Sequence, residues 1–490
     1  SEQHQDAYWM MDLAKSILYD HSFQLWGRPQ NMISPVYPAS IAMLTAFTKD
    51  FFLSGKVISL IAGILAIPAF FYLCRHVYES KNSDIAALIA TALFAIHPWT
   101  VELSVRLMMG SIYLFISILS FLFLFKAKEN KKWLPLLALT TALSVLVRWE
   151  GYALTGAIFL TYVYWQIDIE RLRKGILKLK EPFTKTITSK SVLSAIFIYS
   201  VLVFGWWTRN VLQMGEIFPS YWAKGEMKGG GLGFFGWMNT LNGAFTPLVL
   251  LIAAVGIYVT YKKHFETYLP LYLYLIFYSV EHMIFPHGFL RYAAPLTFVA
   301  YILVGVIVLE ILKKNITDKW LRLLFVASIL IISLAYFINV GPKSIEEHGT
   351  RMEIIQDFSK WYNNNAEKGS VLLASDKLVY GYYIDDEILN YDYANSYARA
   401  FYDQYPDIDY QKNPFLPYIV FVMQQDVRYW IPYDSVMSWF YPNTKRLCDK
   451  PYFKEYSFDI NNNTVILKPI RQFEKNGQNL CVYETQTLIN

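Results

Sequence analysis

The sequence has few charged residues and few cysteines, and each shortage bears on the class of protein. Charged residues make up 17% of the 490 positions, while apolar residues reach 54%; soluble domains carry roughly 25% charged residues. A soluble globule could not bury that much apolar surface and stay dispersed. With three cysteines, no CxxC and no His/Cys cluster, nothing indicates a structural zinc site. We therefore expect an integral membrane protein.

The three cysteines indicate little else. Cys74 lies in an apolar run, where we expect it to serve as packing. Cys448 and Cys481 lie in the polar C-terminal part and could pair if that part faces an oxidising space. The sequence leaves this pairing open.

Charge divides the chain into two parts. Residues 1–340 carry ten more basic than acidic residues, whereas residues 341–490 carry five more acidic than basic residues. Two parts of the chain in different solvents explain this difference in net charge better than a single globular domain does. We expect a first extracytoplasmic loop with amphipathic surface helices over 1–51, a membrane domain over 52–340, and a soluble domain over 341–490.

Apolar runs in the first part are long enough to cross a bilayer, which takes about 20 apolar residues. The candidate spans are 52–74, 83–104, 109–126, 133–147, 152–166, 191–208, 246–262, 266–285, 291–312 and 320–340. The fourth and fifth are short, and a turn over residues 148–151 separates them, which predicts a tight helical hairpin. The fold class is thus a polytopic α-helical membrane protein with about ten spans.

Lysine and arginine predict the orientation, because basic residues favour cytoplasmic loops. The loops after the first, third, fifth, seventh and ninth spans are the basic ones. The N-terminal stretch, the loop 209–245 and the tail 341–490 should then lie outside the cell membrane. We expect the tail to form a small α/β domain, with a helix over Ile345–Tyr362 and strands at Val371–Ala374, Tyr418–Met423 and Thr464–Leu467.

Polar residues that are costly in or beside a membrane span all fall on the predicted outer face. They are Asp6, His97, Glu102, Arg106, Arg148, Glu150, Arg209, Asn210, His282, His287, Arg291 and Tyr292. Each has a structural alternative: the arginines as interface anchors, His97 as a core histidine, Glu150 as the partner of Arg148, and Asp6 as an acid near a helix N-terminus. As a set they suit chemistry on an anionic headgroup. Arginine binds phosphate oxygens bidentately, and a carboxylate accepts the proton of an attacking hydroxyl.

Several short motifs follow one another along the chain in an order that can be compared with known families. They are Gln5-Asp6-Ala7-Tyr8-Trp9, Ser34-Pro35-Val36-Tyr37-Pro38, Ala95-Ile96-His97-Pro98, Val147-Arg148-Trp149-Glu150-Gly151, Trp206-Trp207-Thr208-Arg209-Asn210 and Leu290-Arg291-Tyr292-Ala293-Ala294-Pro295. In this order and on one face, they resemble the GT-C glycosyltransferases of the protein O-mannosyltransferase and aminoarabinose-transferase-like group.

The resemblance implies a function and site residues. The donor would be a sugar on a polyprenyl or dolichyl phosphate, and the acceptor a hydroxyl of a protein, lipid or glycan. Asp6 would be the general base, with Glu2 and Asp12 as rival candidates. The substrate-binding residues would be Arg148, Glu150, Arg209, Arg291, Tyr292, His97, Glu102 and Arg106. The reaction would invert the anomeric carbon without a cofactor, and we assign no metal.

Two features depart from the family pattern. Relatives have a membrane span directly before the catalytic acid, so we expect one upstream of Ser1. Gly110 occupies about the place of a second acid found in many relatives, which puts a second carboxylate in doubt. The alternative functions are a transporter or flippase of lipid-linked intermediates, which would need inverted repeats and broken midplane helices, and a non-catalytic binder in which Asp6 is dispensable.

Overall fold

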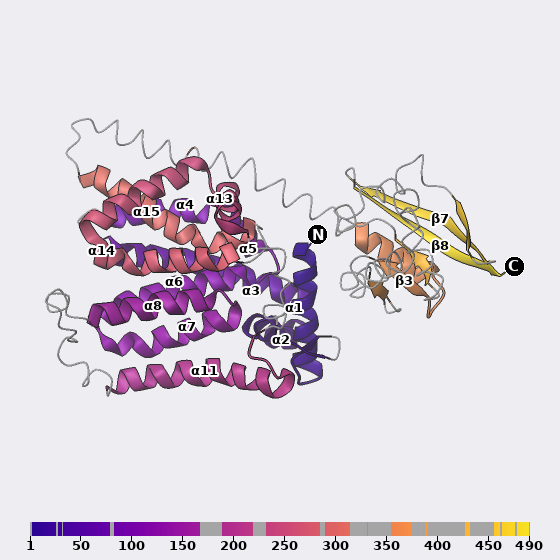
Figure 1. Ribbon diagram of the computed structural model, residues 1–490, viewed down its shortest axis with the longest axis horizontal. Helices are drawn as coiled ribbons and strands as arrows, with labels where there is room; N and C mark the ends of the chain where they lie inside the picture. Colours follow the sequence, from indigo (N-terminus) through magenta and orange to yellow (C-terminus); the bar gives the residue numbers. More distant parts are fainter. Residues whose placement is uncertain are drawn as a thin grey trace. The chain divides into compact units, whose positions relative to one another are not determined.

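The computed structural model describes two compact units, one built of helices and the other containing both helix and β-sheet (Figure 1). One unit comprises Met10–Gly341 and the other comprises Ser1–Trp9 with Pro342–Asn490. The described residues are 2–25, 28–31, 33–78, 83–166, 189–218, 232–284, 290–313, 331, 354–374, 384, 388–390, 427–431, 455–460, 463–475 and 478–489. The predicted tenth span, 320–340, falls outside these ranges except for one residue.

The helical unit begins within α1 (Glu2–Tyr19) and continues through a short hairpin, β1 (Gln24–Leu25) with β2 (Arg28–Pro29). Its main helices are α2 (Val36–Thr48), α3 (Phe51–Val77), α4 (Ser83–Ala95), α5 (Pro98–Val105), α6 (Gly110–Glu129), α7 (Leu134–Val147), α8 (Gly151–Gln166), α11 (Lys190–Met214), α13 (Gly233–Ala244), α14 (Pro247–Ile284) and α15 (Thr297–Lys313). Short 3-10 turns lie at η1 (Lys131–Trp133), η3 (Leu290–Tyr292) and η4 (Ala294–Leu296).

Helix burial shows which helices form the core of this unit. In α6, 78% of the most apolar window is buried, and in the Leu290–Lys313 segment 72% is buried, whereas the corresponding value for α11 is 6%. The apolar side chains of α11 therefore need another apolar surrounding, which a lipid bilayer supplies. Five described helices, or six with one bent pair, are long and apolar enough to cross a membrane.

Two predicted spans differ in detail from the structure. The run predicted as 83–104 forms two helices, α4 and α5, which are bent by 58°. Pro98 is the first residue of α5, and His97 before it is extended with ψ 129°, because a residue that precedes proline disfavours helical ψ. The spans predicted as 246–262 and 266–285 join in α14, which is broken at His264 (φ −143°, ψ 36°).

The described C-terminal residues combine a helix with a mixed sheet. The strands are β3 (Val371–Ala374), β4 (Ile388–Asn390), β5 (Val427–Trp430), β6 (Tyr456–Ile460), β7 (Asn463–Lys475) and β8 (Gln478–Ile489), in the order β4-β3-β5-β8-β7-β6. β3 runs parallel to β4 and β5, and the remaining pairs are antiparallel. β3 has the predicted bounds and β7 contains the predicted strand 464–467. The predicted strand 418–423 lies outside the described residues.

The helix of this unit covers residues 354–365 and packs on the sheet. Ile354, Ile355 and Phe358 are buried, as their helical spacing predicted. The Phe358 ring meets that of Phe473 on β7 at 5.8 Å. The first part of the predicted helix, 345–353, is not described. Cys481 is disulfide-bonded and Cys74 is free and buried, while Cys448 lies outside the described residues.

Candidate active site

The turn between α7 and α8 carries the central pair of the site. Gly151 N donates to Arg148 O at 3.0 Å, which closes the turn. A Cβ on residue 151 would lie 2.3 Å from Val145 N, a backbone atom that cannot move aside. Only glycine therefore permits this close approach. The two short helices lie side by side (Figure 1), as the predicted hairpin requires.

Arg148 and Glu150 pair with each other inside the protein. Arg148 Nε donates to Glu150 Oε2 at 3.0 Å, and Nη2 donates to Oε1. Each residue is 7% exposed, so each charge needs the other. Burial alone raises the pKa of the Glu150 carboxyl, but the adjacent Arg148 guanidinium outweighs burial and lowers that pKa below its usual value. Glu150 is thus an ionised carboxylate that fixes the direction of Arg148.

Two arginines flank the ring of Tyr292, and a third arginine lies near one of them. The guanidinium carbons of Arg148 and Arg291 lie 5.4 and 5.3 Å from the centre of the ring. Arg106 is close enough to Arg291 for the two charges to repel, and it forms an ion pair with Glu102. We refer to Arg106, Arg148 and Arg291 as the arginine cluster. These residues are 185 positions apart in the chain at most, yet the tertiary structure places them together.

The last turns of α14 form a wall beside this cluster. His282 Nε2 lies 4.0 Å from Glu150 Oε1, and its ring stacks on Trp237 of α13 at 4.9 Å. Tyr278 Oη donates to Tyr292 O at 2.7 Å, so α14 also holds the residue at the centre of the cluster. The wall is therefore built of aromatic rings with a single imidazole facing the carboxylate.

Glu281 belongs to the same region, and our sequence interpretation missed it. Its carboxyl interacts electrostatically with both Glu150 and Arg148. It lies in the predicted span 266–285, and an acid inside a span is costly enough to indicate a functional position. That rule could have identified it before the structure was known.

Arg209 makes contacts of a different kind. Its Nη1 donates to Gln30 O and its Nη2 to Phe23 O, both at 2.7 Å. The guanidinium also stacks on Phe23 and Trp206, at 5.3 and 5.0 Å. None of its contacts within the described ranges reaches the arginine cluster. Arg209 thus ties the segment after α1 to α11, and its phosphate-binding role stays a prediction.

His97 is surrounded by aromatic rings. It is 3% exposed, and its ring lies 5.3 Å from that of Phe245 and 5.6 Å from that of Tyr301. These surroundings match the alternative of a core histidine. A substrate contact from His97 stays a prediction.

The expected base is described only in part. Asp6 lies in α1, but its side chain is outside the described part of the structure, as is that of Glu2. Asp12, the other rival, lies on the same helix and is half-buried. The role of Asp6 therefore stays a prediction. His287 is likewise outside the described residues.

A metal site would need several ligands close together. Among the residues whose side chains are described, no group of three or more His, Cys, Asp or Glu could hold a metal ion. Since the side chain of Asp6 is not among them, the expectation of no metal stays a prediction.

Comparison with solved structures identifies the fold. ArnT from Cupriavidus metallidurans bound to undecaprenyl phosphate matches with a TM-score of 0.56 at 12% identity, over 79% of this chain and 81% of that chain. The chain therefore shares the fold of this solved structure. The GT-C resemblance predicted from the motifs is thus confirmed for the fold.

A second solved structure also has a similar fold. The Archaeoglobus fulgidus oligosaccharyltransferase in complex with Zn and sulfate matches with a TM-score of 0.56 at 12% identity, over 78% of this chain. The match covers 58% of the oligosaccharyltransferase, less than two thirds of its length. No family model and no curated protein matches the sequence. The described helices that are long and apolar enough to cross a membrane support an integral membrane protein, as the sequence predicts.

Proposed function

We propose that this protein is an inverting glycosyltransferase that takes a sugar from a polyprenyl-phosphate carrier. The arginine cluster is the observation that carries the proposal. Arg148 and Arg291 flank Tyr292 at the end of a membrane helix bundle, and Arg106 lies beside Arg291. Guanidinium groups held in this way suit a phosphate whose lipid tail remains in the bilayer. The structural similarity to ArnT bound to undecaprenyl phosphate supports the same class of donor.

The chemistry follows from these residues. An acceptor hydroxyl oxygen attacks the anomeric carbon while the bond from that carbon to the phosphate oxygen breaks. The polyprenyl phosphate leaves with the electron pair, and the arginine cluster stabilises the negative charge that it gains. Asp6 accepts the hydroxyl proton. Glu150 acts as a positioning residue, because it holds Arg148 through two hydrogen bonds.

We further propose that the reaction occurs on the extracytoplasmic face. Lysines concentrate at the opposite end of the bundle, in the loops after α6 and in the middle of α14, which favours a cytoplasmic position for that end. The disulfide bond of Cys481 supports an oxidising compartment for the tail. Both observations favour the same orientation.

The decisive experiment compares two acids of α1. We expect Asp6→Asn to lower sugar transfer by about 10²–10⁴-fold, the usual contribution of a general base, while binding of undecaprenyl phosphate is unchanged. Asp12→Asn is the matched control and should retain transfer. The measurement uses purified full-length protein with a panel of polyprenyl-phosphate sugars and an acceptor extract.

The same assay separates the competing functions. Retained turnover in Asp6→Asn, or a loss confined to Asp12→Asn, would refute the assignment of Asp6. A wild-type protein that binds undecaprenyl phosphate but transfers none of the sugars would favour a transporter or a non-catalytic binder.

A further inference from the structure

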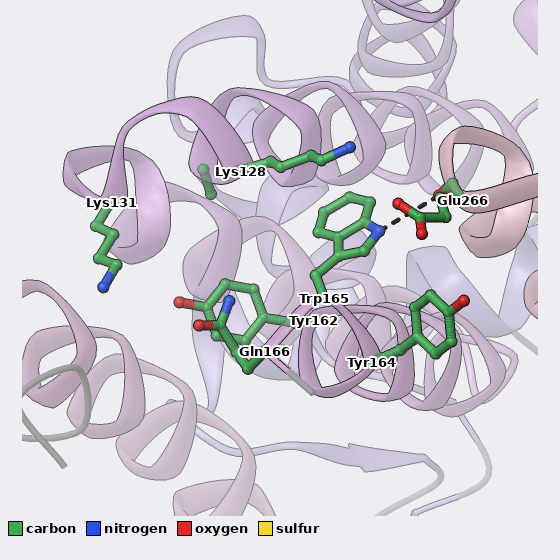
Figure 2. Close-up of a pocket in the computed structure, with 8 residues that line it drawn as sticks. Lys128, Lys131, Tyr162, Tyr164, Trp165, Gln166 and Glu266 are labelled. Carbon is green, nitrogen blue, oxygen red and sulfur yellow. Dashed lines mark hydrogen bonds between the residues drawn. The ribbon is translucent and has the colours of Figure 1, made fainter. Parts of the chain in front are cut away.

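A pocket of about 160 Å³ lies far from the arginine cluster, where α6 and α8 end and α14 is broken. Figure 2 shows its lining side chains, and those used here are Lys128, Lys131, Tyr162, Trp165, Gln166 and Glu266. We refer to it as the lysine pocket. Nothing in the proposed sugar transfer uses it, since Trp165 and Gln166 lie at the last turn of α8 whereas Glu150 directly precedes its first residue.

The lining is polar and bears a net positive charge. Lys128 and Lys131 supply two ammonium groups, and Glu266 supplies one carboxylate. In Figure 2, Lys131, Tyr162 and Gln166 lie on one side of the pocket, while Glu266 lies on the other. The side near Lys131 thus combines a cation with a hydroxyl and an amide, which are donors suited to the oxygens of an anion.

Tyr162 gives the second indication of a ligand. Its hydroxyl is shielded from water and has no hydrogen-bond partner in the described part of the protein. An unpaired polar group of this kind costs free energy. A phosphate oxygen that enters beside Lys131 would supply the missing partner once the Tyr162 side chain turns toward the pocket.

The pocket lies at a level where lipid headgroups are expected. Lys126 Nζ lies 4.5 Å from the centre of the Trp133 ring, and Lys128 Nζ lies 4.7 Å from that of Trp165. Trp165 Nε1 also donates to Glu266 O at 3.3 Å, which ties the end of α8 to α14. Tryptophan, tyrosine and lysine at helix ends mark the boundary between bilayer and water.

We propose that the lysine pocket binds the phosphate of an anionic phospholipid headgroup on the membrane face opposite the arginine cluster. A membrane lipid is favoured over a soluble phosphate because the pocket lies in this belt of aromatic and basic residues. A bound lipid would link the ends of α6 and α8 to the break in α14. The proposal does not depend on the sugar-transfer function.

Native mass spectrometry of the purified full chain tests the proposal. Titration with phosphatidylglycerol should show one lipid bound more tightly than phosphatidylcholine. Lys131→Gln and Tyr162→Phe should each weaken that binding about tenfold, the effect of one charge-assisted hydrogen bond. Lys132→Gln is the matched control, since Lys132 is adjacent in sequence and does not line the pocket. Tyr162→Phe should leave lipid-free thermal stability unchanged, because the hydroxyl has no described hydrogen bond to lose.

A separate titration with inorganic phosphate distinguishes the two sources of the anion. We expect no competition with phosphatidylglycerol at millimolar phosphate. Competition at that concentration would assign the pocket to a soluble phosphate compound and overturn the lipid proposal. Equal affinity for the two lipids, or equal binding by Lys131→Gln and Lys132→Gln, would overturn the site itself.

Discussion

At the scale of single residues, the buried pair of Arg148 and Glu150 makes each partner dependent on the other. Two charges that are each 7% exposed have lost most of their hydration. Their attraction and two hydrogen bonds offset that loss. The intact pair therefore need not raise the free energy of unfolding. Removal of one partner, in contrast, leaves the other charge buried without the group that it pairs with.

We expect Glu150→Leu to lower the free energy of unfolding by about 3 kcal/mol, because Arg148 then stays buried without its counter-charge. Sugar transfer should fall as well, since the guanidinium loses its fixed direction. Thermal unfolding of the purified protein in detergent measures the first effect.

The double variant Arg148→Met with Glu150→Leu separates stability from function. It removes both charges, so most of the lost stability should return, whereas transfer should remain low. Recovery of transfer in the double variant would show that Arg148 does not contact the donor phosphate.

At the scale of elements, two breaks shape the end of the bundle that holds the arginine cluster. Pro98 bends α4 against α5, and the turn that closes at Gly151 reverses the chain between α7 and α8. Arg106 directly follows α5, the helix that Pro98 begins, and Arg148 begins the turn before α8. Each arginine therefore owes its position to a backbone irregularity more than to a helix face.

Gly151→Ala should lower the free energy of unfolding by about 1–3 kcal/mol, the range for overpacking, because the new Cβ would meet backbone atoms of Ser144 and Val145. Gly205→Ala is the matched control. Nothing lies within 4 Å of a Cβ at that position in α11, so alanine should be neutral or slightly favourable there. Equal thermal stability of the two variants would contradict this account of the turn.

At the scale of the whole molecule, the two ends of the helical unit differ in charge. One end carries the arginine cluster and the other carries Lys128, Lys131, Lys132, Lys262 and Lys263. Basic residues of short loops favour the cytoplasm. We therefore expect the lysine end to face the cytoplasm, and the sequence separately predicts an extracytoplasmic tail.

Cysteine labelling in intact cells tests this topology. Asn364→Cys, at an exposed position of the tail helix, should react with a membrane-impermeant maleimide. Lys132→Cys, which is also exposed, should react only after permeabilisation. Two of the three native cysteines should stay unlabelled, because Cys74 is buried and Cys481 is disulfide-bonded. The reverse labelling pattern would invert the orientation and move the proposed reaction to the cytoplasm.

The sequence by itself determined the membrane class and the positions of most helices. This was possible because apolar run length and loop charge act locally, residue by residue along the chain. The hairpin at residues 148–151 and strand β3 follow from such local patterns. Glu281 could have been included on the same grounds, as an acid in an apolar run.

Only the tertiary structure decided which arginines meet. Arg148 and Arg291 flank Tyr292 and Arg106 lies near Arg291, while Arg209 donates to backbone carbonyls of the segment after α1. The four looked equivalent in sequence, because a guanidinium near a helix end has the same local signature in either role. What distinguishes them is which distant backbone or ring each one reaches, and that depends on how the helices pack.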